Sequence, residues 1–335
     1  MLKNYNITSL STLLSSKHGA VMRMKHGELE IRILDDRTVR IIYRQNAIKS
    51  KSKELIILEK KRRPVEFDVR TSGRTYEIST RALKMIIRKD VGEIRFLDKR
   101  TGITILQEHP HGRRITESLV EGIRTLGAEQ AFVSPRDEAI YGLGQQQDGV
   151  VDYRGRFAHL SQFNTVIAVP VLVSSNGYGI LWNNCSLTEI NRHKIEIPLQ
   201  FDPYTRTSRA SFKTAAAGRY NFILEQLLSR PEIQLTVNGR PLIDLKANCS
   251  LGSNFSNFPR FVSASIVLKK GNHSIEAKGP ARLYFQPPLS SAKTSIWSEV
   301  ADCVDYFFMY GPEPDEIIRS YREITGHAPM FGKWV

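Results

Sequence analysis

The chain has 335 residues, of which 48 are Lys or Arg and 34 are Asp or Glu, and hydrophobic residues make up 41% of it. At ~100–200 residues per domain this length predicts two or three domains, and the apolar content excludes a disordered chain. The three cysteines stand far apart with no Cys-x-x-Cys pair, which excludes a zinc finger and a disulfide scaffold. We expect Cys185, Cys249 and Cys303 to be buried free thiols, with one disulfide and an odd thiol as the alternative.

No apolar run reaches the ~18 residues that a membrane-spanning helix needs, so no membrane span is predicted. Met1 to Leu14 has Lys3 ahead of a weakly apolar stretch, but serines and threonines interrupt it and no small-residue cleavage site follows. We identify no signal peptide here. Because a truncated start would look the same, the compartment stays open.

From residue 20 to about 110, short apolar runs alternate with polar residues, at the spacing of roughly ten residues that is typical of antiparallel sandwiches. Leu29–Ile33 and Val39–Tyr43 flank a turn at Asp35-Asp36 and predict a hairpin. Further strands with the same alternation are predicted at Val65–Val69, Tyr76–Ile78, Leu83–Ile87 and Ile94–Phe96. This part of the chain therefore predicts an antiparallel β-sandwich.

The positive charge is concentrated in this strand-rich region. Residues 37–114 contain 21 lysines and arginines against 9 aspartates and glutamates, so they account for +12 of the net charge of +14. Arg40, Lys84 and Arg88 stand at alternate positions of half-buried strands, which predicts a solvated sheet face. A nucleic-acid interface would need interleaved aromatic residues for stacking, and Tyr43 and Phe67 fall in the core phase instead. Net charge alone supports nucleic-acid binding, and no nucleic-acid partner is predicted.

Val166–Val173 predicts a long buried strand, in which Pro170 marks an edge, an end or a bulge. Asn176-Gly177 then predicts a type I′ hairpin turn, because both central residues of that turn need positive φ. The turn leads into a strand at Tyr178–Trp182.

A second β unit begins near residue 205. Its second Asn-Gly turn, Asn238-Gly239, joins two strands, and Asn248–Asn257 predicts a long loop. The strands predicted for this unit are Tyr220–Leu224, Ile233–Val237, Pro241–Ile243, Ala264–Leu268, Ile275–Ala277 and Leu283–Phe285. After an apolar run at Trp297–Met309, one helix is predicted from Pro314 to a stop at Gly326.

The glycine-rich stretch Tyr141–Gln145 has no G-x-G-x-x-G pattern between a strand and a helix, so it predicts no dinucleotide site. Instead, it is part of six ordered segments that together resemble glycoside hydrolase family 31, the α-glucosidase and α-xylosidase family. The segments are Glu138–Gln145, Val151–Gly155 with Gln162–Thr165, Pro170–Gly179 with Asn183-Asn184, Asp305–Pro312, Tyr321–Gly326 and Ala328–Trp334. The last three resemble the strand, the helix and the entry that lead to the catalytic barrel of that family.

The resemblance implies an all-β fold: a galactose-mutarotase-like β-sandwich with a smaller inserted β-sandwich and one C-terminal helix. The expected domains are the first segment of the N-terminal sandwich (1–205), the insert (206–288), the return segment (289–312), and the helix with the start of the barrel (313–335). Gly218–Phe222, Ile233–Gly239 and Leu268–His273 make the insert similar to the protective-antigen-like domain. The insert departs from that domain at Glu225–Leu228, so we expect a spacer or a wall rather than a calcium or sugar site.

Retaining glycoside hydrolysis needs two carboxyl groups about 5–5.5 Å apart. In this family both are Asp residues of the barrel, and their motifs are not found in this chain, so we expect no catalytic residue here and no activity of the chain alone. Glu138, Asp148 and Asp152 could be suggested as a substitute pair, but turn and loop roles are the expectation for them. The eight histidines form no metal-ligand spacing, and neither a metal nor a cofactor is expected.

The resemblance implies that the N-terminal domain supplies one wall of the sugar pocket. The matching positions are Gln162, Phe163, Asn164 and Thr165, where Asn164 can hydrogen-bond sugar hydroxyls and Phe163 can stack on a sugar ring. The family often has Asp at the position of Asn164. The implied partners are an oligosaccharide with α-linked glucose or xylose and a catalytic barrel, which a separate chain could carry. The alternative is a stand-alone carbohydrate-binding or interaction protein.

Overall fold

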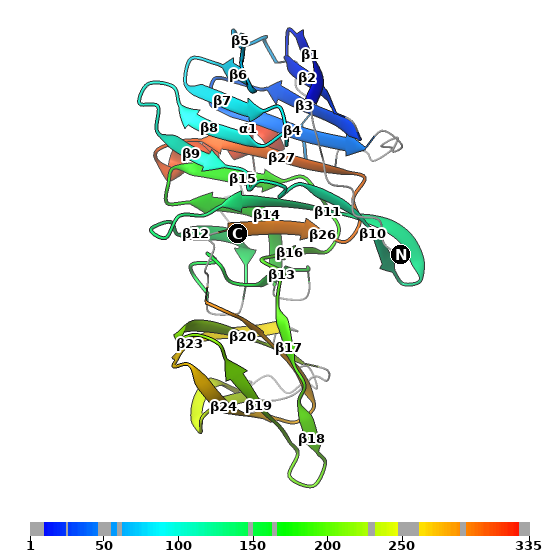
Figure 1. Ribbon diagram of the computed structural model, residues 1–335, viewed down its shortest axis with the longest axis vertical. Coiled ribbons are helices and arrows are strands. Elements are labelled where there is room, and N and C mark those ends of the chain that lie inside the picture. Colours follow the sequence, from blue (N-terminus) through cyan, green and yellow to red (C-terminus); the bar gives the residue numbers. More distant parts are fainter. Residues whose placement is uncertain are drawn as a thin grey trace, which may run out of the picture. The chain divides into compact units, whose positions relative to one another are not determined.

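A computed structural model describes residues 10–24, 26–45, 55–58, 62–146, 150–162, 166–226, 232–246, 261–288 and 293–327. Within these residues the chain forms 27 strands and one helix, which confirms the all-β class (Figure 1). The chain divides into two compact units. Unit 1 contains residues 1–143, 169–189 and 293–335, and unit 2 contains residues 144–168 and 190–292. The expected domain boundaries near residues 205 and 289 stay a prediction.

The largest sheet has eight strands and is built from both ends of the sequence. Its order is β1 (Leu10–Ser16), β2 (Gly19–Met24), β3 (Gly27–Ile33), β4 (Thr38–Gln45), β27 (Cys303–Tyr310), β15 (Tyr178–Trp182), β14 (Ile167–Ser174) and β12 (Ile140–Gln145). The predicted hairpin of β3 and β4 is confirmed.

Strand β27, which returns late in the chain, lies between β4 and β15. Its Tyr306 is in register with Ile41 of β4 on one side and with Trp182 of β15 on the other. Figure 1 shows this late strand, in orange, within the sheet of early strands. Among the described strands, β27 thus pairs the early strand β4 with β15 of the middle part of the chain.

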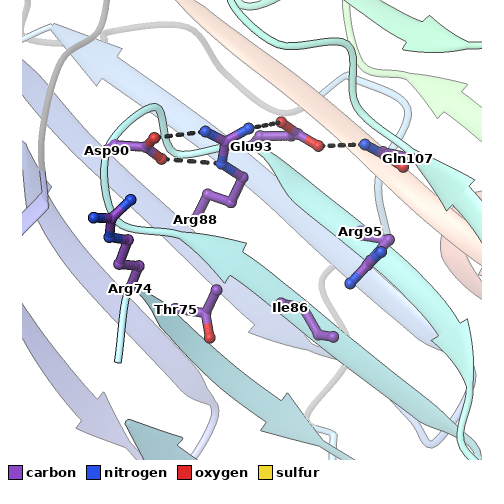
Figure 2. Close-up of a pocket in the computed structure, with 8 residues that line it drawn as sticks. All are labelled: Arg74, Thr75, Ile86, Arg88, Asp90, Glu93, Arg95 and Gln107. Atoms are coloured by element: carbon purple, nitrogen blue, oxygen red, sulfur yellow. Dashed lines mark hydrogen bonds and ion pairs between the residues drawn. The ribbon is translucent and has the colours of Figure 1, made fainter. Parts of the chain in front are cut away.

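A five-stranded meander forms a second sheet of unit 1. It contains β5 (Asp68–Ser72), β6 (Thr75–Ser79), β7 (Leu83–Arg88), β8 (Ile94–Asp98) and β9 (Thr104–Gln107). The predicted strands are confirmed except at Val65–Phe67, which precede β5. On β7, Met85 and Ile87 are buried while Lys84 and Arg88 lie on the outer face. Lys84 pairs there with Glu77 at 2.8 Å, and Arg88 with Asp90 at 2.6 Å (Figure 2), so the solvated face is confirmed for these two residues.

The remaining strands of unit 1 form a further sheet. It contains β10 (Arg114–Val120), β11 (Ile123–Val133), β26 (Lys293–Ser298) and β16 (Thr188–Ile190). Ring contacts join the sheets across the core: Phe96 of β8 stacks on Phe308 of β27 at 4.2 Å, and Phe132 of β11 meets Tyr306 edge-on at 5.3 Å. Aromatic side chains thus make contacts between the sheets inside the sandwich.

Helix α1 (Pro314–Thr325) is confirmed, with Pro314 in its first turn. Glu313 and Glu316 form a reciprocal capping box, which satisfies amide groups that a helix start leaves unpaired. Ile317 and Ile324 are buried against a cluster that includes Phe307. The sequence also led us to expect an exposed apolar surface at Phe307, Tyr321, Ile324 and Trp334. This expectation is wrong for Phe307 and Ile324, because the two side chains are buried in one cluster between the helix and the sheet, while Tyr321 is half-buried and Trp334 lies outside the described residues.

Unit 2 forms a smaller sandwich of its own, and also holds β13 (Ala158–Leu160). One sheet contains β17 (Ile195–Ile197), β25 (Ala281–Gln286), β20 (Gly218–Gln226) and β23 (Phe261–Leu268). The other contains β18 (Gln200–Asp202), β19 (Thr207–Thr214), β24 (Gly271–Lys278), β21 (Glu232–Val237) and β22 (Arg240–Lys246). Phe222, Leu235 and Ala277 are fully buried in its core. The strands predicted for this unit are confirmed, and the predicted loop Asn248–Asn257 lies outside the described residues.

The two Asn-Gly turns differ. Asn238 and Gly239 both have positive φ, 52° and 72°, and confirm the type I′ turn. At Asn176-Gly177 only Gly177 has positive φ, at 76°, so the predicted type I′ turn is wrong. Ser174 is in register with Tyr178, and the Gly177 amide donates to the Ser174 carbonyl at 3.1 Å. The extra residue produces a three-residue loop, which places positive φ only at its last position.

Strand β14 is not the fully buried strand that its apolar sequence predicts. Only Leu172 and Ser174 are buried, so one face of the strand packs and the other is partly open. The pairing of β14 with β15 begins at Val171. Pro170, which lacks an amide hydrogen, is the residue directly before this pairing.

The cysteines also depart from expectation. Cys185 and Cys303 are free thiols, but Cys185 is exposed, because it follows the end of β15 in a surface connection, and Cys303 is half-buried. Cys249 lies outside the described residues. Burial raises the pKa of the Cys303 thiol well above its ordinary value, which disfavours the thiolate form.

Candidate functional site

The predicted sugar-facing segment lies between β13 and β14. Gln162 is exposed, and its Oε1 accepts a hydrogen bond from the backbone amide of Ala168 at 3.1 Å. The Gln146 side chain donates through Nε2 to the carbonyl of Ile167 at 3.2 Å. Two side-chain amides thus bind the backbone of Ile167 and Ala168, where β14 begins. The other predicted site residues, Phe163, Asn164 and Thr165, lie outside the described residues.

The glycine-rich stretch has an unusual backbone, which explains its composition. Gly142, Leu143 and Gly144 all have positive φ, at 104°, 67° and 93°. A Cβ on Gly142 would lie 2.6 Å from the carbonyl oxygen of Val171, so only glycine fits between β12 and β14 at this point. Leu143 is strained in this region, and its side chain is 1% exposed, so packing offsets the strain. Gly142 therefore serves close strand packing.

Glu138 is a buried acceptor in a network of hydroxyl groups. Ser134 donates to its Oε2 at 2.5 Å, and Ser174 and Tyr178 each donate to its Oε1 at 2.6 Å. Its residue exposure is 3%. Burial, followed by the negative charge of Glu138, raises the pKa of Tyr178 well above its ordinary value. The motif that begins at Glu138 and the motif that contains Ser174 and Tyr178 are therefore joined by one carboxylate.

Of the other two carboxylates suggested as a substitute catalytic pair, only Asp152 is described, and it has a local role. Asp152 accepts a hydrogen bond from the backbone amide of Arg154 at 2.9 Å, which is a local turn contact. Asp148 lies outside the described residues. Among the described residues, no group of three His, Cys, Asp or Glu side chains could hold a metal ion. No helix in the described ranges has the length and apolar character of a membrane span.

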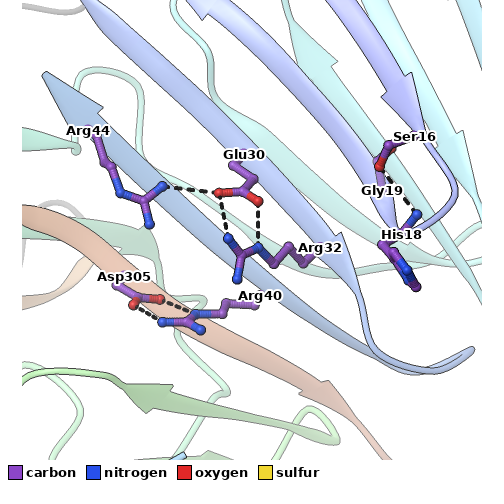
Figure 3. A network of polar contacts seen from close by, with 8 residues as sticks. All are labelled: Ser16, His18, Gly19, Glu30, Arg32, Arg40, Arg44 and Asp305. Carbon is purple, nitrogen blue, oxygen red and sulfur yellow. Dashed lines mark hydrogen bonds and ion pairs between the residues drawn. The ribbon is translucent and has the colours of Figure 1, made fainter. Parts of the chain in front are cut away.

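A buried ion pair joins β4 to β27, and the sequence analysis missed it. Arg40 donates to both oxygens of Asp305, at 2.9 and 2.5 Å (Figure 3). Asn183 donates to Asp305 Oδ2 at 2.8 Å. The guanidinium also lies 5.0 Å from the ring centre of Phe307. The prediction that Arg40 lies on a solvated sheet face is therefore wrong, because the side chain is buried in this ion pair. The available signal was Ile42, an apolar residue in the same strand phase, which indicated that this face of β4 is covered too.

A second buried pair lies deeper in the sandwich. Arg113 donates through Nη2 to both oxygens of Glu108, at 2.5 and 2.6 Å, and Tyr306 donates to Glu108 Oε1 at 2.7 Å. The amide of Ile94 donates to the other oxygen at 2.8 Å. Burial and then Glu108 raise the pKa of Tyr306 well above its ordinary value. No motif in the sequence marked this pair, because its members come from separate strands and loops.

Comparison with known proteins finds similarity to one family. Residues 28–191 match the glycosyl hydrolase 31 N-terminal galactose mutarotase-like domain. An α-xylosidase of Saccharolobus solfataricus is 30% identical over 322 residues, which are 93% of this chain and 30% of that protein. The chain thus spans less than a third of the length of this curated relative.

Solved structures show the same fold. The family 31 α-xylosidase of Xanthomonas citri superposes with a TM-score of 0.77 at 23% identity, over 96% of this chain and 41% of that chain. A Flavobacterium johnsoniae dextranase solved with isomaltotriose gives a TM-score of 0.58 at 15% identity, over 98% and 29% of the two chains. At these identities the likeness concerns the fold.

Proposed function

We propose, from the premise that this chain belongs to glycoside hydrolase family 31 through its N-terminal galactose mutarotase-like domain, that it is the carbohydrate-facing support region of an α-glycosidase. The proposed type is an α-xylosidase or α-glucosidase, acting on an oligosaccharide with α-linked xylose or glucose. Gln162, Phe163, Asn164 and Thr165 form one wall of the sugar pocket in this proposal.

The observation that supports this role is the hydrogen bond between Gln162 and the amide of Ala168. This hydrogen bond occupies the side-chain oxygen of Gln162, so in this proposal Gln162 positions the backbone of the wall and does not bind the sugar through that oxygen. The polar contact to sugar hydroxyls is then assigned to Asn164, whose amide both donates and accepts, and ring stacking is assigned to Phe163.

The chain alone is proposed to be inactive. A retaining enzyme needs a nucleophilic carboxylate and a protonated acid about 5–5.5 Å apart with access to the glycosidic bond. Glu138 is buried beneath three hydroxyl donors and Asp152 is engaged in a turn. The catalytic carboxylates therefore come from a barrel, within the same protein or on a separate chain.

The test is activity on aryl α-xylosides and α-glucosides, with and without co-expression of the part of the Saccharolobus solfataricus α-xylosidase that this chain does not cover. No turnover is expected from the chain alone, and turnover is expected with the barrel. The Asn164→Ala variant should then lower kcat/KM, while Gln200→Ala, at an exposed amide of unit 2, should not.

Hydrolysis by the isolated chain would overturn the proposal. Oligosaccharide affinity of the isolated chain, lost in Asn164→Ala and without any gain of activity from a barrel, would favour a stand-alone sugar-binding protein instead.

A further inference from the structure

The outer face of the five-stranded meander carries a pocket of about 390 Å³ (Figure 2). Its lining comes from neighbouring strands on the same face, because Thr75 is in register with Arg88, and Ile86 with Arg95. A volume in this range accommodates a small ligand such as one or two sugar units.

One wall of the pocket is an internally satisfied charge cluster. Arg88 donates to both oxygens of Asp90, at 3.1 and 2.6 Å, and pairs with Glu93 at 3.4 Å. Glu93 is buried, and its Oε1 accepts from Gln107 at 2.6 Å. The Arg88 guanidinium is thus paired with these two carboxylates. The carboxylate oxygens of Asp90 and Glu93 can still accept further hydrogen bonds at this wall of the pocket.

Two other lining arginines have no such partner. Among the described residues, neither Arg74 nor Arg95 has an ion pair, and both side chains are exposed. Figure 2 shows them on either side of Thr75 and Ile86, with no interaction drawn to either. A guanidinium presents a planar fork of donors that matches a carboxylate, and Arg74 and Arg95 are the two lining guanidinium groups without an ion pair among the described residues.

We propose that this pocket binds an acidic oligosaccharide, a sugar chain that contains uronic acid residues. Arg74 and Arg95 bind the uronate carboxylates, and Ile86 contacts the apolar face of a sugar ring. The hydroxyl of Thr75 and the carboxylates of Asp90 and Glu93 accept hydrogen bonds from sugar hydroxyls. The proposal is independent of the catalytic role of the family.

The lining favours this ligand over other polyanions. Asp90 and Glu93 would repel a phosphate dianion more strongly than a singly charged uronate that also offers hydroxyl donors. No aromatic side chain stands among the described lining residues, so the pocket lacks the stacking surface that single-stranded nucleic acid uses.

The test uses the full chain and isothermal titration at low salt with trigalacturonate, its carboxyl-reduced neutral counterpart and inorganic phosphate. Binding of trigalacturonate alone is expected. The Arg74→Gln/Arg95→Gln double variant should weaken it roughly tenfold or more, the effect of losing charge-assisted hydrogen bonds. Arg70→Gln is the matched control, because Arg70 is exposed, lies on the same face in register with Glu77, and does not line the pocket.

Three results would overturn the proposal: no binding of trigalacturonate, equal binding of the neutral sugar or of phosphate, or the same loss in Arg70→Gln as in the double variant. A perturbed fold of the double variant is checked by its thermal unfolding midpoint. The Ile86 δ1-methyl resonance gives a readout in the unmodified protein, and it must shift during the titration while methyl resonances of unit 2 do not.

Discussion

The hydroxyl of Tyr178 donates a 2.6 Å hydrogen bond to a carboxylate oxygen of Glu138, a residue 40 positions earlier in the chain. Both groups are buried, and the carboxylate receives two further hydroxyl donors. Because a hydrogen bond to a charged acceptor inside a protein is worth about 1.5–3 kcal/mol, this contact fixes β15 to the segment before β12.

High pH should weaken the fold through this contact. The folded-state pKa of Tyr178 is raised, so its share of the stability is complete below the unfolded pKa of about 10 and is lost as the pH rises above it. The free energy of unfolding should fall by about 1.4 kcal/mol per pH unit for each such tyrosine. Urea unfolding from pH 9 to 11.5 measures the slope.

The variants Tyr178→Phe and Tyr306→Phe should each reduce this slope by the contribution of one tyrosine, since the pKa of Tyr306 is raised in the same way. The control is Tyr141→Phe, at an exposed tyrosine. Equal slopes in the wild type and Tyr178→Phe would contradict the assignment.

The Arg40–Asp305 pair should behave as a buried ion pair in a double-mutant cycle. Asp305→Leu leaves the guanidinium uncompensated and should cost about 3–5 kcal/mol, and adding Arg40→Met should recover much of this loss. Arg209→Met, which removes the exposed pair with Glu276, should cost less than about 1 kcal/mol. Chemical unfolding of the wild type, Arg40→Met, Asp305→Leu and the double variant gives the coupling energy, and a coupling near zero would show that the pair is not desolvated.

Replacing Gly142 with any residue that has a Cβ should destabilise the fold. Gly142→Ala places a Cβ against the Val171 carbonyl and fixes an unfavourable φ, which together should cost about 2–5 kcal/mol. At Gly102, which also has positive φ, a Cβ meets nothing within 4 Å, so Gly102→Ala should cost only about 1–2 kcal/mol of backbone strain. Thermal unfolding compares the two, and equal losses would mean that close strand approach is unimportant.

The Gln162 contact should be local in its effect. Gln162→Ala should leave the global free energy of unfolding within about 0.5 kcal/mol of the wild type, as for most surface substitutions. The exchange of the Ala168 amide hydrogen should nevertheless become faster, because that amide loses its acceptor. Hydrogen exchange followed at Ala168 tests this, with Gln200→Ala as the control that should leave it unchanged.

Much of the fold follows from local patterns in the sequence. Alternation at Leu83–Ile87, the Asn238-Gly239 turn and the Pro314 helix start each depend on short-range preferences, and the structure confirms all three. Asn176-Gly177 misled because its turn type depends on the register of β14 with β15, one residue longer than the dipeptide indicates. Register depends on how two strands pair, so it cannot be predicted from the sequence of one strand alone.

The buried charges show the same limit. Arg40 looked solvent-facing because alternation in β4 describes one covered face, whereas this strand is covered on both. Arg113 and Glu108 carry no local signal, since each becomes a partner only when its loop is folded beside the other. Of the predicted site, Gln162 can be placed and has a loop-shaping contact, while the roles of Phe163, Asn164 and Thr165 stay predictions.

The central position of β27 sets an order of assembly during synthesis. Strands β4 and β15 are made long before β27, and each must leave one hydrogen-bonding edge unpaired until residues 303–310 emerge. Unpaired edges of this kind attract other chains. The strands of unit 2 are synthesised before β27, so unit 2 can fold while the eight-stranded sheet still lacks this strand. Premature termination before Cys303 should therefore leave two aggregation-prone half-sheets rather than a smaller stable domain.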